Sequence, residues 1–146
     1  MSKFLVDFCA ECVSPEQIHA YYEGSLKALQ IKKRIGRKCK YSSYSEREYA
    51  YDVAARELSI EAGFMLLSYV EALFRMDLML RLENRKWKDP LSMFFRDNRK
   101  PDKKVFQYPM DTILEGWRKD SDSTKDMIDI ACNLPQYFNY RHWVAQ

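Results

Sequence analysis

The sequence predicts an all-α protein, an up-and-down bundle of four to five helices with one long central helix. Apolar residues recur with helical period, and Ser or Asp followed by Pro, Glu or Gln marks several helix starts. No run of alternating branched residues between turn signals indicates a strand. With 146 residues, 47% of them apolar, the chain can bury one real core, and no repeat or linker divides it. We therefore expect a single domain over residues 1–146.

The first predicted helix begins at Ser14 and runs towards Gly36. Ser14 is the expected N-cap, Pro15 takes the first helical position, and Gln17 closes a capping box. The basic, Ser- and Tyr-rich stretch that follows, up to Ser45, is expected to be a loop. The apolar side of the helix carries Ile18, Tyr21, Tyr22, Leu26 and Leu29.

The long helix is predicted over Glu46–Trp87. Ser45 and Glu48 form a second capping box that sets its start. Two apolar stripes lie on opposite sides at 100° per residue, so we expect neighbours on both faces. One stripe contains Leu58, Ala62, Met65, Leu66, Tyr69, Leu73, Met76 and Leu80, and the other contains Ile60, Phe64, Leu67 and Leu78.

Two carboxylates, Glu71 and Asp77, interrupt these stripes. Each has a cation one turn later, Arg75 after Glu71 and Arg81 after Asp77. Ordinary i,i+4 ion pairing is the favoured explanation of this arrangement, and a functional site is the alternative.

Three shorter helical segments are predicted after the long helix. Asp89 can cap a short helix through Phe95, and the charged stretch 97–107 is expected to be an exposed loop. A second short helix is expected over Pro109–Trp117, followed by a turn at 120–123. From Thr124 another helix begins, and Pro135 is expected to interrupt it or to start the next one.

Charge and cysteine content restrict the classes of function. The net charge is +3, but two basic runs, 32–40 and 96–104, suit a polyanion, and Tyr41 and Tyr44 beside the first run could stack on bases. The four cysteines show no disulfide framework. Cys9 and Cys12 form a single C-x-x-C motif, which is interpreted as two reduced thiols. No signal peptide, membrane span or metal-ligand cluster is visible, so we expect a cytoplasmic protein without a metal or other cofactor.

The C-terminal segment carries the most distinctive motif, Tyr140-Arg141-His142-Trp143-Val144-Ala145. On residue chemistry alone, cations there can simply favour the negative end of a helix dipole. The run nevertheless resembles the signature of HEPN domains, an Arg, a polar residue, and a His four to six positions after the Arg. The segment 71–77 of the long helix is similar to the acidic segment of a conserved helix in that family. The resemblance covers roughly residues 46–146.

This resemblance implies an all-α bundle that forms a homodimer and cleaves RNA without a metal, as in toxin–antitoxin and other defence systems. An imidazole can take the proton of a ribose 2′-OH, and a guanidinium can hold the phosphate that this oxygen attacks. Carried onto this chain, the motif arginine is Arg141, the polar residue is His142, and the acid is Glu71. The expected substrate-binding residues are Arg75, Tyr140, Lys33, Arg34 and Arg37.

The chain departs from the family at Gln146, which stands where the motif histidine belongs. Glutamine cannot act as a base near neutral pH, so either His142 does that work or the chain is inactive. We favour an impaired or C-terminally truncated form over an active one. Two rivals remain: a non-catalytic HEPN-like module for dimerisation or for binding an antitoxin or other partner, and a helical interaction protein of no nuclease lineage.

Overall fold

The computed structural model describes residues 13–36, 43–99, 104, 107–120 and 122–144, and for residues 140–144 it describes the backbone alone. Within these ranges the chain forms helices and no strand, which confirms the all-α fold class with one long helix. The chain divides into two compact units, Met1–Tyr69 and Val70–Gln146. The helices are α2 (Pro15–Gly36), α3 (Tyr44–Glu83), α4 (Pro90–Asp97), α5 (Met110–Lys119) and α6 (Lys125–Val144).

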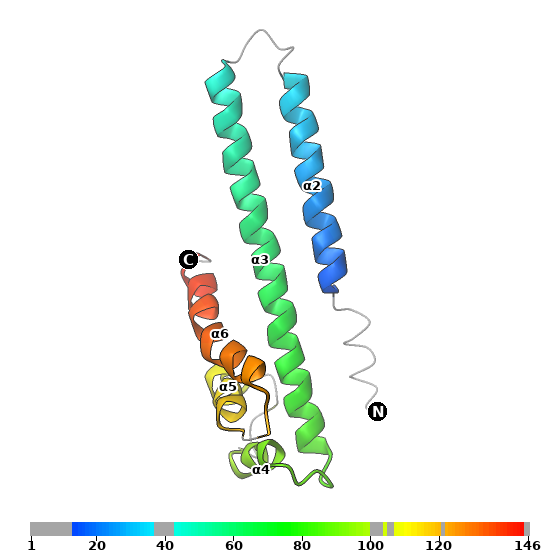
Figure 1. The fold of residues 1–146 in the computed structure, drawn as a ribbon, viewed down its shortest axis with the longest axis vertical. Coiled ribbons are helices and arrows are strands. Elements are labelled where there is room, and N and C mark those ends of the chain that lie inside the picture. The colour runs from blue at the N-terminus through cyan, green and yellow to red at the C-terminus, as the bar shows by residue number, and fades with distance from the viewer. Residues whose placement is uncertain (1–12, 37–42, 100–103, 105–106, 121, 145–146) are drawn as a thin grey trace. The chain divides into compact units, whose positions relative to one another are not determined.

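In the first unit, α2 runs antiparallel to the beginning of α3 (Figure 1). The predicted capping box at the start of α2 is confirmed: the Ser14 amide donates to Gln17 Oε1 at 2.8 Å, and the Gln17 amide donates to Ser14 Oγ at 3.3 Å. The two helices are joined by polar contacts, such as Tyr21 to Glu61 at 3.2 Å. Ile18 of α2 and Leu58 and Ala62 of α3 are buried.

The prediction that Ser45 and Glu48 cap the long helix is wrong. The capping box lies two residues earlier, where the Ser43 amide donates to Glu46 Oε2 at 2.7 Å and the Glu46 amide donates to Ser43 Oγ at 3.2 Å. Glu48 is instead an ion-pair partner of Lys33 on α2. The Lys33–Glu48 ion pair accompanies the Ser43 capping box, which is formed in place of the overlapping Ser45 signal.

The long helix also ends earlier than predicted, at Glu83 and not at Trp87. The side chain of Asn84 accepts a hydrogen bond from the Lys86 amide at 3.3 Å. This local bond stabilises a turn that competes with continuation of the helix. The guanidinium of Arg96 on α4 donates to the carbonyls of Arg85 and Trp87 and so holds this turn.

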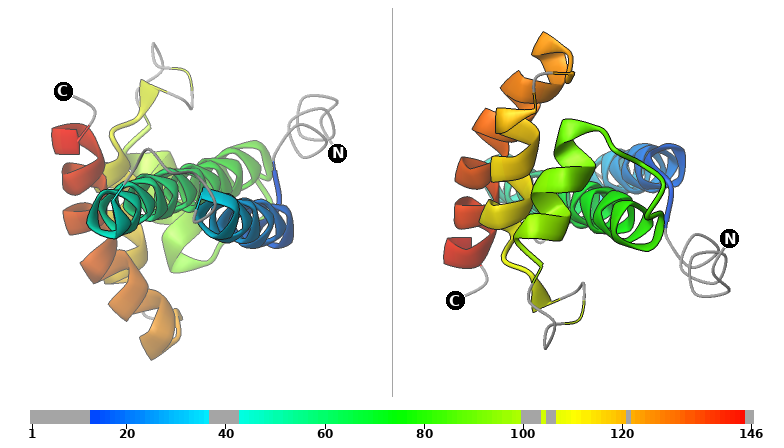
Figure 2. Two further views of the ribbon diagram at one scale, coloured as in Figure 1. Left: turned by 90° about the horizontal axis from the view of Figure 1, so that it is seen from above. Right: turned by 90° about the horizontal axis from the view of Figure 1, so that it is seen from below.

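In the second unit, α5 lies between α4 and α6 (Figure 2). The predicted cap of α4 is confirmed, because Asp89 Oδ1 accepts from the Ser92 amide at 3.0 Å. A T-shaped contact between Phe74 of α3 and Trp117 of α5, with ring centroids 5.8 Å apart, joins those helices. The buried core of this unit contains Phe74, Leu78, Leu82, Leu91, Phe95, Tyr108, Ile113, Leu114, Ala131 and Leu134.

Pro135 lies inside α6, so the prediction that it ends one helix or begins another is wrong. A proline in a helix interior costs about 3 kcal/mol in hydrogen bonding and sterics. Ala131 and Leu134, on the turn before it, are buried, and this packing offsets the local cost.

The apolar stripes of α3 are covered only in part. Leu58 and Ala62 of the first stripe are buried, whereas Leu66 and Leu73 of the same stripe are exposed. Leu78 of the second stripe is buried too, so the expectation of neighbours on both faces is met in part. None of the described helices combines the length and the apolarity that crossing a bilayer requires.

Substitutions of Gly116 and Gly24 give a matched test of how tightly α5 packs against α4. A Cβ on Gly116 of α5 would lie 2.7 Å from Phe95 Cε1 and 3.0 Å from Phe94 Cδ1, whereas a Cβ on Gly24 of α2 would meet nothing within 4 Å. We expect Gly116→Ala to lower the free energy of unfolding by about 2 kcal/mol through overpacking. We expect Gly24→Ala to raise it by up to about 1 kcal/mol through helix propensity. Urea denaturation of both variants checks this, and equal effects would contradict the α4–α5 contact.

Candidate functional site

Glu71 and Arg75 of α3 form the ion pair that the sequence predicts. Arg75 Nε and Nη2 both donate to Glu71 Oε1, at 3.0 and 2.9 Å. Arg75 Nη1 donates to the backbone carbonyl of Tyr108 at 3.0 Å. The guanidinium therefore orients the carboxylate and also fastens the segment before α5 to α3. Both side chains remain about a quarter exposed, at 24% for Glu71 and 22% for Arg75.

Asp77 and Arg81, the second predicted pair, belong to a larger network. Arg81 Nε donates to Asp77 Oδ2 at 2.7 Å, as the i,i+4 spacing predicts. Arg81 Nη1 also donates to Asp89 Oδ1 at 2.7 Å and to Ser92 Oγ at 3.2 Å, and Ser92 is fully buried. One guanidinium thus joins the end of α3 to the N-cap and first turn of α4.

The pKa values of Asp77 and Asp89 are shifted in opposite directions by their surroundings. Burial raises the pKa of Asp77, and Arg81 offsets only part of that rise. Burial by itself would raise the pKa of Asp89 too, but hydrogen bonds from Ser92 and the charge of Arg81 outweigh it and lower that pKa. Arg81 acts to lower the pKa of both carboxyl groups, but burial outweighs it at Asp77, and at Asp89 it adds to the larger effect of the Ser92 hydrogen bonds.

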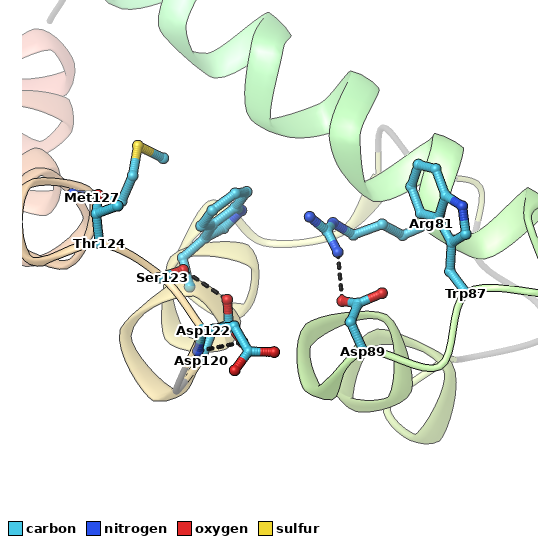
Figure 3. A pocket seen from close by; sticks show the side chains of 9 residues that line it. Arg81, Trp87, Asp89, Asp120, Asp122, Ser123, Thr124 and Met127 are labelled. Atoms are coloured by element: carbon cyan, nitrogen blue, oxygen red, sulfur yellow. Dashed lines mark hydrogen bonds and ion pairs between the residues drawn. The ribbon is translucent and has the colours of Figure 1, made fainter.

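Arg81 also lies at the side of an open pocket of about 510 Å³ (Figure 3). The rings of Trp87 and Trp117 flank its guanidinium, with their centroids 5.8 and 5.4 Å from Cζ. The opposite wall comes from the turn before α6 and from its first residues. That wall contains Asp120, Asp122, Ser123, Thr124 and Met127.

The turn at 120–123, predicted from its composition, shapes that wall. Asp120 is buried, and its carboxylate accepts from Ser123 Oγ at 2.6 Å and from the Asp122 amide at 3.4 Å. The side chain of Asp122 is exposed and has no hydrogen-bond or ion-pair partner among the described residues. Sequence reasoning missed this pocket, because it is built from segments about 40 positions apart that no local pattern connects.

Residues 140–144 of the C-terminal signature lie on α6, which is helical as far as Val144. The side chains of Tyr140, Arg141 and His142, and the whole of Gln146, lie outside the described residues. The meeting of Arg141 with Glu71 in one cleft therefore stays a prediction.

The basic residues proposed to bind substrate have different environments. Lys33 pairs with Glu48 and lies over the Tyr51 ring, 4.2 Å from its centroid. The hydrogen bond to Glu48 raises the pKa of Lys33, so its charge is secure at neutral pH. Arg34 is exposed, and Arg37 lies outside the described residues.

Comparison of the chain with protein-family models, with curated proteins and with solved structures gives no match. The function is therefore inferred from the residues themselves. Over the described ranges, no group of three His, Cys, Asp or Glu side chains is arranged to hold a metal ion.

Proposed function

We propose that the chain is a HEPN-like, metal-independent endoribonuclease domain of a toxin or defence system, with cleavage impaired by Gln146. The observation that carries the proposal is that residues 140–144, which include the Arg-His pair of the motif, form the end of helix α6 in an all-α chain. A helix fixes the spacing of the backbone positions that carry the Arg and the base.

The roles follow from side-chain chemistry. Arg141 is always charged and holds the scissile phosphate, stabilising the negative charge that develops on it. A base must take the proton from the ribose 2′-OH, and Gln146 has no group that can do so near neutral pH. His142 is the nearest imidazole in the sequence and supplies a reduced rate.

Glu71 positions the site in this proposal. The geometry on α3 supports that role, because Arg75 contacts Glu71 through two nitrogens and leaves its carboxylate about a quarter exposed. A carboxylate held in this way can orient Arg141 without contacting RNA itself. Arg75, which is bonded to both Glu71 and the Tyr108 carbonyl, is better suited to positioning Glu71 than to binding substrate.

RNA cleavage in excess EDTA tests the proposal, with the natural chain beside Arg141→Ala. Slow cleavage that survives EDTA, leaves a 2′,3′-cyclic phosphate and is lost in Arg141→Ala supports it. Cleavage that EDTA abolishes, or that Arg141→Ala retains, contradicts it.

The second candidate is a non-catalytic HEPN-like module that forms a homodimer or binds an antitoxin or other partner. It is favoured by exposed apolar side chains on α6, because Ile130 and Tyr137 are seven residues apart and share one face. A tight dimer that Tyr137→Ser weakens, together with no cleavage by any form carrying histidine at position 146, would establish this alternative.

A further inference from the structure

Helix α2 carries a second apolar stripe that the proposed cleavage does not use. Its members follow one another at alternating steps of three and four residues, which is the spacing of positions a and d in a coiled-coil heptad labelled a to g. They are Tyr21, Gly24, Ala28, Ile31 and Ile35. At 100° per residue the centre of this stripe lies roughly 140° from the side of α2 that faces α3, which carries the buried Ile18, Tyr22 bonded to Ser59, and Lys33 bonded to Glu48.

The stripe is open to solvent. All five of its residues are exposed, and Ile31 and Ile35, one turn apart, keep 55% and 62% of their surface in water. A Cβ on Gly24 would meet nothing within 4 Å. A single exposed apolar side chain is common, but five at heptad spacing form a continuous seam whose burial against a partner is favourable.

The shape of the seam suits a helix better than a bilayer. Gly24 and Ala28 project little or no side chain, so bulky residues of a facing helix can pack close to the α2 backbone there. A helix that lies in a membrane surface presents a broad face of large apolar residues. This stripe occupies two positions of each heptad, which is the width of a coiled-coil seam.

The residues that flank the seam carry positive charge only. Lys27 and Arg34 occupy g positions, Lys32 occupies an e position, and all three are exposed. The other flanking positions hold the uncharged residues Ala20 and Ser25. Cations on both edges favour a partner helix with carboxylates at its own e and g positions.

The same charges disfavour a second copy of this chain on the seam. In a parallel pair of identical helices, each g position faces the e position five residues later on the other helix. This would bring Lys27 of one helix opposite Lys32 of the other. An antiparallel pair would again set cations against cations, because neither flank carries an acid. The seam therefore selects a different chain.

We propose that this outer face of α2 binds an amphipathic helix of another protein, apolar at its a and d positions and acidic at its e and g positions. Ile31 and Ile35 are the apolar anchors, and the flanking cations pair with the acidic side chains. Arg34, expected from the sequence to bind RNA, is thereby assigned to a protein partner. The interaction does not depend on RNA cleavage.

Binding of designed peptides to the full chain tests the proposal. The probe is a fluorescently labelled peptide of about three heptads with Ile at a, Leu at d and Glu at e and g. A second peptide has Lys at e and g, and a third contains the residues of the first in scrambled order. In fluorescence anisotropy we expect saturable binding of the first peptide, and binding of the other two at least about tenfold weaker.

Two double variants separate the contribution of the anchors from that of the charges. Ile31→Ser with Ile35→Ser should weaken binding of the acidic peptide at least about tenfold, because it removes the apolar anchors. Lys27→Glu with Lys32→Glu should reverse the preference, so that the lysine peptide binds more tightly than the acidic one. Ile130→Ser is the matched control, since Ile130 is an isoleucine of α6 that is 46% exposed, and it should leave all three affinities unchanged.

Equal binding of the ordered and scrambled acidic peptides, or a preference that the charge reversal leaves unchanged, would overturn the proposal. Self-association of the natural chain that Ile31→Ser with Ile35→Ser abolishes would also overturn it, because a second copy would then cover the face. Displacement of the acidic peptide by poly(U) would assign the cations to nucleic acid and overturn it too. Absence of peptide binding alongside metal-independent RNA cleavage would contradict this proposal and leave the proposed function standing.

Discussion

Gln146→His is expected to raise metal-independent RNA cleavage by at least about 100-fold over the natural chain, within the range that a positioned general base contributes. The substitution puts an imidazole at the position that the resemblance assigns to the motif histidine. Its protonation state can change near neutral pH, which the glutamine amide cannot do. The rate should therefore rise with pH through the histidine pKa, ordinarily near 6.5.

The control for this prediction is His142→Ala in both backgrounds. In the natural chain the loss of His142 should abolish residual cleavage, because no other imidazole lies in the motif. In the Gln146→His background it should reduce the rate only modestly. A rate that follows His142 alone in both backgrounds would show that position 146 is not where the base acts.

Arg81→Met is expected to lower the free energy of unfolding by about 2–3 kcal/mol, or roughly 6–10 °C in Tm. The variant keeps much of the apolar stem but leaves Asp77 and Asp89 without their shared cation. Removing one partner of a fully buried pair costs about 3–5 kcal/mol, and solvent screening of these partly exposed carboxylates lowers that figure.

The pH dependence of Arg81→Met separates lost charge from lost packing. Without Arg81, burial raises the pKa of Asp77 in the folded state still further above its unfolded value. An acidic group whose pKa is higher in the folded state than in the unfolded state lowers the free energy of unfolding at pH values above the folded-state pKa. This destabilisation disappears as the pH falls below the unfolded-state pKa, near 3.9. The destabilisation should therefore be smaller at pH 4 than at pH 7 in denaturant titrations.

Lys119→Met is the matched control for Arg81→Met. Lys119 pairs with Glu115 at the same i,i+4 spacing, but both side chains are about half exposed or more, at 63% and 47%. Its removal should leave the free energy of unfolding nearly unchanged, because solvent screens an exposed pair. Equal losses in the two variants, or a loss for Arg81→Met that does not depend on pH, would contradict the network.

Local signals in the sequence predicted most of the helices, but they could not decide between overlapping alternatives. Asp89 could be identified as a cap because its spacing to Ser92 is local. Ser43 and Ser45 offered overlapping capping boxes, and the contact of Glu48 with Lys33 across the hairpin accompanies the choice of Ser43. Periodicity alone cannot reveal such a contact.

In the candidate sites, too, local ion pairs could be predicted from the sequence and long-range contacts could not. The pairs Glu71–Arg75 and Asp77–Arg81 could be predicted from i,i+4 spacing. Two other features depend on segments that are distant in the sequence. They are the hydrogen bond from Arg75 to the Tyr108 carbonyl and the pocket wall that contains Asp122. These contacts require the fold, because no spacing rule connects a helix to loops 30 to 40 positions away.

A time course of RNA cleavage in excess EDTA, by Gln146→His and by Gln146→His with Arg141→Ala, tests directly whether Arg141 is the centre of a ribonuclease site. The single variant is expected to cleave RNA to 2′,3′-cyclic phosphate ends, and the added Arg141→Ala change is expected to abolish cleavage. Inactivity of the single variant, or equal cleavage by both proteins, would contradict a HEPN-like ribonuclease centred on Arg141.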